Sequence, residues 1–150
     1  MPIGGTVMWM FKKDKIKSIN SADHKLSVSQ VQNDEGALII RLNETAKEWA
    51  KHPKLNIRVG FSFPLLEIEG SVNFDEVEDR IDDLMTKTGV SIQVLAITTN
   101  TFKEFVFYIE NASGIEKAHK QAIQDFPELD VQCYGENDPE WQGYLQWQKA

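Results

Sequence analysis

The sequence predicts an α+β fold with a ferredoxin-like βαββαβ core and an antiparallel sheet, to which an N-terminal β-hairpin, a short helix and a C-terminal short helix are added. Three observations predict this core. Residues 57–63 alternate apolar and polar side chains, which is typical of a strand with one buried face. Segments 74–85 and 115–126 repeat apolar residues at helical spacing. Runs 90–98 and 102–109 have strand composition and a short polar connection, which indicates an antiparallel pair.

Two strands and a short helix are predicted before this core. Residues 25–32 alternate imperfectly, and residues 37–42 form a stronger strand. Segment 33–36 (Asn-Asp-Glu-Gly) between them has turn residues and a glycine free to take a positive φ, so we expect a hairpin. Asn43 is placed to cap a short helix that Pro53 ends. We expect these elements to extend the sheet or to cover its second face.

The two core helices have recognisable ends. Asn73 and Glu76 form a capping-box-like start for the first helix, and Gly89 is placed to end it. Ser113 and Glu116 predict the same start for the second helix. Right-handed crossovers then close the unit into a four-stranded sheet with both helices on one face. The last strand is marked by Leu129, Val131 and Cys133.

Composition describes a globular protein and argues against several classes. The 150 residues are 41% hydrophobic and 26% charged, as in an ordinary folded domain. We expect a leader, residues 1–24, that is partly disordered, and a single α+β domain, residues 25–150. The lone cysteine, Cys133, excludes an internal disulfide, and its apolar neighbours favour a buried residue over a nucleophile. Without a signal-peptide pattern or an apolar run of about 18 residues, we expect a cytoplasmic protein.

The net charge of −7 is unevenly distributed. Residues 1–25 carry five lysines against two acids, whereas residues 26–150 carry 21 acids against eleven basic residues. A surface of this sign repels phosphate backbones, so we expect no nucleic-acid binding, and it attracts basic proteins. The leader segment 1–17, with an apolar cluster followed by four lysines, is the one candidate for membrane contact, although a first strand or a frayed terminus is favoured.

No catalytic, metal-binding or cofactor-binding pattern is found in the sequence. Asp75, Asp79 and Asp82 share one stripe of a predicted helix, where a cation or a basic partner would bind. The i, i+4 pairs Glu76 to Arg80 and Asp83 to Lys87 favour a solvated face instead. The three histidines lack the spacing of a zinc helix, and no glycine-rich phosphate loop occurs. We therefore predict no catalytic residue, no metal and no cofactor.

Several motifs within residues 37–147 resemble a known family. The most specific is D-P-E-W-x-x-Y at 138–144, and I-R-L-N at 40–43 and R-V-G at 58–60 also match. By these motifs the chain resembles a bacterial domain-of-unknown-function family, number 695. Lys103 stands where the family pattern has arginine, which puts in doubt any role that needs a guanidinium there. The resemblance implies a fold more than a function. Some relatives carry a domain similar to the protein regulator of ribonuclease E, which by analogy implies regulation through protein contact.

The aromatic C-terminus is the main candidate site. Its residues join large aromatic area to two acids, as interface hot spots do, and we predict that they bind a protein partner. In the alternative interpretation, which the sequence favours, a short helix lays Trp141 and Tyr144 over the open face of the sheet, and Trp147 faces the partner. The predicted partner-binding residues are Asp138, Glu140, Trp141, Tyr144 and Trp147.

The sequence favours a small acidic module that binds and regulates a protein partner, such as a basic nuclease or toxin. The alternative is an enzyme or small-ligand binder with a pocket between the N-terminal elements and the sheet. Its residues would be His52, Arg41 and Glu104, acting as acid, anchor and base. Nothing in their spacing shows that these three converge, and the oligomeric state is not determined by the sequence.

Overall fold

The computed structural model describes residues 24–33, 36–65 and 72–148. The expected leader, apart from its last residue, and the tip of the predicted hairpin turn lie outside the described residues. The elements are β1 (Leu26–Asn33), β2 (Gly36–Asn43), the 3-10 helix η1 (Glu44–Trp49), β3 (Ile57–Pro64), α2 (Phe74–Lys87), β4 (Ser91–Thr98), β5 (Phe102–Ile109), the 3-10 turn η2 (Ala112–Gly114), α3 (Ile115–Asp125), β6 (Gln132–Asn137) and α4 (Gln142–Leu145).

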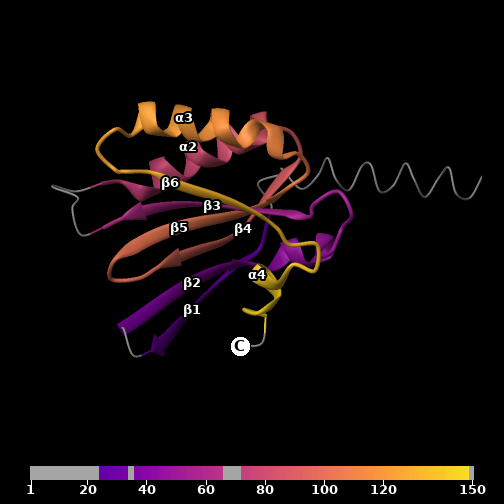
Figure 1. The fold of residues 1–150 in the computed structure, drawn as a ribbon. Helices are drawn as coiled ribbons and strands as arrows, with labels where there is room; N and C mark the ends of the chain where they lie inside the picture. Colours follow the sequence, from indigo (N-terminus) through magenta and orange to yellow (C-terminus); the bar gives the residue numbers. More distant parts are fainter. Residues whose placement is uncertain (1–23, 34–35, 66–71, 149–150) are drawn as a thin grey trace, which may run out of the picture.

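The described strands form one antiparallel sheet in the order β1-β2-β4-β5-β3-β6 (Figure 1). β4 and β5 pair as predicted, with a register shift between Gln93 and Leu95. The sheet has two strands more than the predicted core, because β2 pairs with β4 and β1 pairs with β2. The N-terminal hairpin therefore extends the sheet, and β1 and β6 are its two edge strands.

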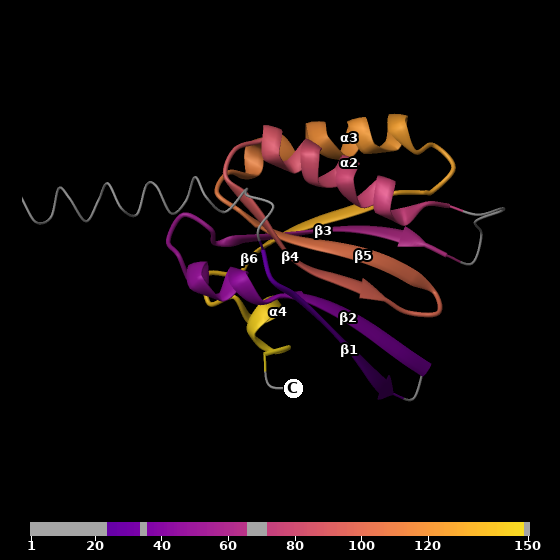
Figure 2. The same ribbon diagram turned by 180° about the vertical axis from the view of Figure 1, so that it is seen from behind.

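Helices α2 and α3 lie side by side over one face of the sheet (Figures 1 and 2). The alternation of β3 turns its odd-numbered apolar residues toward these helices, as predicted from the sequence. Phe61 packs edge-on against Phe107 of β5, with ring centroids 6.3 Å apart. We call this cluster the helix-side core; its fully buried residues include Val59, Phe61, Phe63, Ile81, Met85, Phe105, Phe107, Ile109 and Ala122.

A second apolar cluster fills the opposite face of the sheet. There, η1 and the C-terminal segment around α4 cover β2, β4 and β5 (Figure 2). Apolar residues on both faces of β4 and β5 therefore reflect a sheet that is covered on both sides. We call this cluster the second core; it contains Ile40, Leu42, Ala46, Trp49, Leu55, Ile92, Val94, Leu95, Val106, Tyr108, Trp141 and Tyr144.

Several predicted element ends are confirmed. The side-chain oxygen of Asn73 accepts hydrogen bonds from the backbone N–H groups of Asp75 (3.0 Å) and Glu76 (3.4 Å) at the start of α2. Asn43 accepts one from Ala46, although the element it caps is a 3-10 helix. Gly89 has a φ of 136°, which suits glycine at a helix C-terminus.

The capping box predicted for the second helix is wrong. Asn111, not Ser113, provides the cap, since its side chain accepts a hydrogen bond of 2.9 Å from the Ser113 N–H group. The chain then makes η2 and enters α3 at Gly114 without a side-chain cap. The last strand also begins at Gln132, after the buried residues Leu129 and Val131. The four-residue motif from Ser113 to Glu116 did not distinguish a 3-10 turn from the first turn of an α-helix.

No helix of the described residues is long and apolar enough to span a membrane.

Candidate functional site

Asp138 of the D-P-E-W motif lies at the centre of a buried hydrogen-bond network. Its carboxylate accepts a bond of 2.6 Å from the Tyr108 hydroxyl and one of 3.1 Å from the Arg58 guanidinium. The N–H groups of Gln142 (3.0 Å) and Gly143 (2.9 Å) also donate to it, so Asp138 caps α4. Burial alone would raise the pKa of Asp138, but the Tyr108 hydroxyl, the two N–H groups and Arg58 together hold the pKa below its usual value.

Trp141 and Tyr144 of the same motif are fully buried in the second core. The Trp141 ring stacks on Tyr108, with centroids 4.1 Å apart, and its indole N–H donates to the Leu55 carbonyl at 2.7 Å. The Tyr144 hydroxyl donates to the Asn43 carbonyl at 2.6 Å. Trp141 has a left-handed backbone conformation, with a φ of 57°, which turns the chain back over the sheet. The motif thus holds the C-terminal segment around α4 against the second face of the sheet.

The predicted partner-binding residues therefore differ in their access to solvent. Asp138, Trp141 and Tyr144 are buried, as the alternative interpretation of the two aromatic residues expected. Trp147 is half-buried and packs against the second core. The Glu140 side chain is 66% exposed and lies 3.9 Å from the Lys51 ammonium group. Of these five residues, Glu140 and Trp147 remain accessible to a partner.

The three residues of the predicted alternative pocket are not brought together. Arg41 lies on the helix-covered side of the sheet and contacts Glu78 of α2. Glu104 lies on the opposite face, where it accepts a hydrogen bond of 2.9 Å from the Tyr134 hydroxyl. His52 follows η1, and its Nδ1 accepts a bond from the Lys54 N–H group. Because Arg41 and Glu104 point to opposite sides of the sheet, they do not share one reacting centre.

The described residues give no support for a nucleophilic or metal-binding site. Burial raises the pKa of the Cys133 thiol to about 12, which keeps the thiol protonated at neutral pH. The ring Nε2 of His119 lies 2.8 Å from the Val131 carbonyl oxygen and is occupied there. Within the described residues, no group of three or more His, Cys, Asp or Glu side chains is arranged to hold a metal ion.

The β1–β2 hairpin carries an unusual concentration of exposed apolar residues. Val28 is 69% exposed, Leu26 53% and Ile39 41%. Val28 pairs with Arg41 across the two strands, as Leu26 does with Asn43, so these apolar side chains point to the side of the sheet where Arg41 meets α2. The helices do not extend over this part of the sheet (Figure 1). We call Leu26, Val28 and Ile39 the hairpin face.

An acidic stripe of α2 borders the hairpin face. Glu78 contacts both Arg41 of β2 and Gln93 of β4, so this side of the helix is directed toward the hairpin. The other members of the stripe are exposed and follow at helical spacing. Glu78 contacts Arg41, and Asp75 lies close enough to Arg41 and Lys103 to interact with both, whereas Asp82 interacts with His24. We call Asp75, Glu78, Asp79 and Asp82 the acidic flank.

Sequence reasoning recognised part of this surface. The stripe of Asp75, Asp79 and Asp82 was visible from helical spacing alone. The hairpin face was missed, because alternation shows which residues of a strand share a side but not whether another layer covers that side. The available signal was the imperfect alternation of residues 25–32, where apolar residues fall on both sides of the strand.

Comparison with known proteins gives a family. The family model described as a family of unknown function, DUF695, matches residues 27–147, which is most of the chain. The chain belongs to this family. The DUF695 match spans both apolar cores, the hairpin and the D-P-E-W motif. No curated protein and no solved structure gives a significant match.

Proposed function

We propose that this DUF695 protein is an acidic binding module that regulates a protein partner by contact, and that it acts in the cytoplasm. The partner we infer is a basic protein that presents a segment with one apolar side and one lysine- or arginine-rich side. The observation that carries this proposal is the exposed hairpin face beside the acidic flank. Apolar side chains would supply buried area, and the carboxylates would supply orientation and fast association.

The edge strand β1 supports this proposal. Exposed edge strands are usually protected by lysine, proline or a bulge, but β1 has the sequence LSVSQVQN, without charge or proline. The Lys25 carbonyl accepts a bond of 2.8 Å from the Glu44 N–H group on the β2 side. By the alternation of antiparallel pairing, residues 26, 28, 30 and 32 direct their backbone groups outward. An extended partner segment would find hydrogen-bonding groups there.

The electrostatics of the surface support a basic partner. Val28, Leu26 and Ile39 carry no charge, so the field over the hairpin face comes from its neighbours. The acidic flank contributes four carboxylates, and the residues from 26 onward carry 21 acids against eleven bases. A basic segment gains attraction from both, whereas a second acidic copy of the chain or an anionic surface is repelled.

We also propose that β3, α2, β4, β5, α3 and β6 form a ferredoxin-like unit. The element order and the strand order β4-β5-β3-β6 support this assignment, as does the packing of both helices against one face. In this view the hairpin is an addition at the β4 edge. Its apolar surface then has no role in the core of that unit, which favours a role in binding.

A pair of peptides tests the proposed function. The peptide KVKLKVKLKVK, which alternates lysine with apolar residues as an extended segment requires, carries the proposed chemistry, and EVELEVELEVE has the same apolar pattern with the opposite charge. We expect the basic peptide to bind in calorimetry, with a Kd that rises with salt, and the acidic peptide not to bind. Val28→Ser and Asp79→Lys should each weaken binding by about three- to tenfold.

The matched control is Glu128→Lys, which reverses an exposed charge in the turn that follows α3. Its effect on the Kd should be clearly smaller than that of Asp79→Lys. Equal effects would show attraction by net charge alone and contradict a defined surface. Two other results would overturn the proposal, because they would assign the hairpin face to a different occupant. One is dimerisation through β1 in sedimentation experiments, and the other is binding to anionic vesicles that Val28→Ser abolishes.

A further inference from the structure

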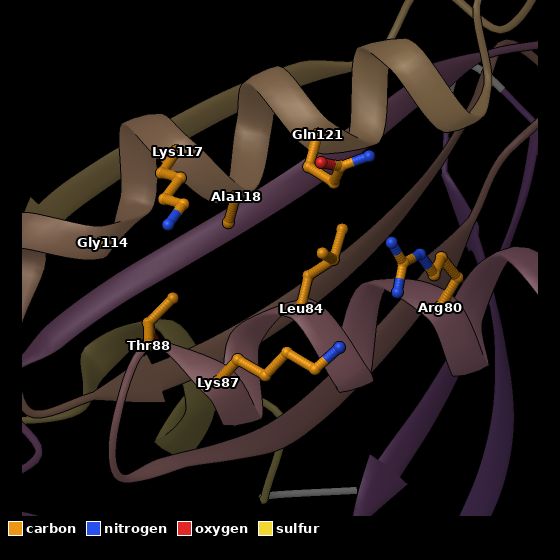
Figure 3. Close-up of a pocket in the computed structure, with 8 residues that line it drawn as sticks. All are labelled: Arg80, Leu84, Lys87, Thr88, Gly114, Lys117, Ala118 and Gln121. Atoms are coloured by element: carbon orange, nitrogen blue, oxygen red, sulfur yellow. The ribbon is translucent and has the colours of Figure 1, made fainter.

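A cleft of about 380 Å³ lies between α2 and α3, on a different surface from the hairpin face. Its floor contains Leu84 of α2 and Ala118 of α3, whose side chains face each other across the gap (Figure 3). Both residues are largely buried, at 7% and 4% exposure. The volume lies within the range of small-molecule sites, which combine an apolar lining with a few polar groups.

Small residues explain why the cleft exists. At one end the helices approach closely, because Gly114 lies against Thr88: a Cβ on Gly114 would lie 2.7 Å from the Thr88 Cβ. Further along, Ala118 stands opposite Leu84, and its short side chain leaves the space between the helices unfilled (Figure 3). The cleft is thus closed at the Gly114 end and has an apolar floor.

Three basic side chains line the cleft of this otherwise acidic protein. Arg80 is bonded to Asp125 at 2.6 Å and to Asp83 at 3.0 Å, and the Lys87 ammonium also lies 3.0 Å from Asp83. Lys117 makes no ion pair with any described residue. Three cations and two carboxylates therefore leave one positive charge without a partner.

We propose that this cleft binds a small organic monoanion, with an apolar body over Leu84 and Ala118 and a carboxylate at Lys117. The unpaired charge of the cleft matches one negative charge, so a polyanion such as a nucleoside triphosphate fits poorly. Lys117 supplies a mobile point charge for the carboxylate. The Arg80 guanidinium lies at the opposite end of the cleft (Figure 3) and is already bonded to Asp125 and Asp83. Gln121, at the rim, adds a side-chain amide to the polar groups.

A charge-matched ligand pair tests the proposal. The full chain, labelled with ¹⁵N, is titrated with 4-phenylbutyrate and with 4-phenylbutyramide, which has nearly the same shape without the charge. We expect saturable shifts of the backbone amides in residues 80–88 and 114–121 with the carboxylate. The amide ligand should bind about three- to fivefold more weakly, as expected for loss of one partly exposed ion pair.

Two variants distinguish binding in the cleft from general electrostatic attraction of the anion to the protein. Lys117→Glu should weaken carboxylate binding by about tenfold and leave amide binding unchanged. Lys120→Glu is the control, because Lys120 pairs with Glu116 at 3.2 Å and does not line the cleft. The proposal would be overturned if both variants lost the same carboxylate affinity, or if the two ligands bound equally well. It would also be overturned by amide shifts centred outside the cleft, or by no shift up to about 10 mM ligand.

Discussion

Asp138 shows how one side chain organises a large part of this structure. It accepts hydrogen bonds from Tyr108, Arg58, Gln142 and Gly143, and it is 7% exposed. A buried carboxylate is tolerated only when such partners replace water. In return, the bonds fix the turn that places the following aromatic residues on the second core. The acid of the D-P-E-W motif therefore has a structural role.

The first prediction concerns Asp138→Asn. At pH 7 this change should lower the free energy of unfolding by about 1–3 kcal/mol, because the Arg58 guanidinium loses one of its two carboxylate partners, Glu136 being the other, and an amide cannot accept every bond. The folded state holds the pKa of Asp138 below the unfolded value of about 3.9. Its contribution is therefore present above about pH 4 and is lost as the pH falls through the folded pKa.

Urea denaturation from pH 3 to pH 7 measures this effect. The difference in free energy of unfolding between the parent protein and Asp138→Asn should decrease as the pH falls, because the carboxyl group of the parent then also becomes uncharged. Glu140→Gln, two residues away and 66% exposed, should change stability by less than about 0.5 kcal/mol. If this difference in the free energy of unfolding stays constant with pH, the role assigned to the negative charge of Asp138 is contradicted.

At the scale of single elements, α2 separates two surfaces of opposite character. Its acidic flank lies toward the hairpin, whereas Arg80 and Lys87 line the cleft toward α3. The apolar residues between these sides, among them Ile81 and Met85, pack into the helix-side core. One amphipathic helix with charges sorted to its two sides can thus support both proposed sites. The position of α2 affects each of them.

The start of α2 provides the next prediction. Asn73→Ala removes the acceptor for the N–H groups of Asp75 and Glu76 and should lower the free energy of unfolding by about 1 kcal/mol. Asn73→Asp keeps the acceptor and adds a negative charge at the positive end of the helix, so it should be neutral or slightly stabilising. Chemical denaturation of the two variants side by side is the measurement. Equal destabilisation would show that the cap bond is not the cause.

At the scale of the whole molecule, one sheet separates two apolar cores. The helix-side core is built from the elements between β3 and β6, whereas the second core joins η1 to the C-terminal segment. The Trp141 indole bonds to Leu55, 86 positions earlier, and the Tyr144 hydroxyl bonds to Asn43, 101 positions earlier. The segment from Asn43 to Leu55 and the C-terminal segment therefore stabilise the second core jointly.

Trp141→Ala tests this dependence. The change removes a fully buried ring that stacks on Tyr108, and it should lower the free energy of unfolding by about 3–5 kcal/mol. That is a large part of the 5–15 kcal/mol typical of a domain. Trp147→Ala is the control, and its cost should be clearly smaller because this side chain is half-buried. Thermal and urea unfolding followed by circular dichroism give both values.

Local signals predicted the elements well where they were strong. The limits of β5 (Phe102–Ile109) agree with prediction, and the cap at Asn73 and the positive φ of Gly89 are confirmed. The failures were local as well. Ser113 was predicted to cap α3, but Asn111 caps a 3-10 turn instead. The pair Glu76 to Arg80 was expected at i, i+4, but Arg80 bonds Asp83 and Asp125, because α3 brings Asp125 within reach.

The sequence by itself determined the elements and their order, because strand alternation, helical spacing and capping residues act within a few positions of one another. It also determined the family, through the short D-P-E-W motif and its companions. Only the tertiary structure decided which surfaces are free. Trp141 and Val28 are both apolar in sequence, yet one is fully buried and the other is 69% exposed. Burial depends on segments that are distant in the chain, and no local pattern records which of them pack together.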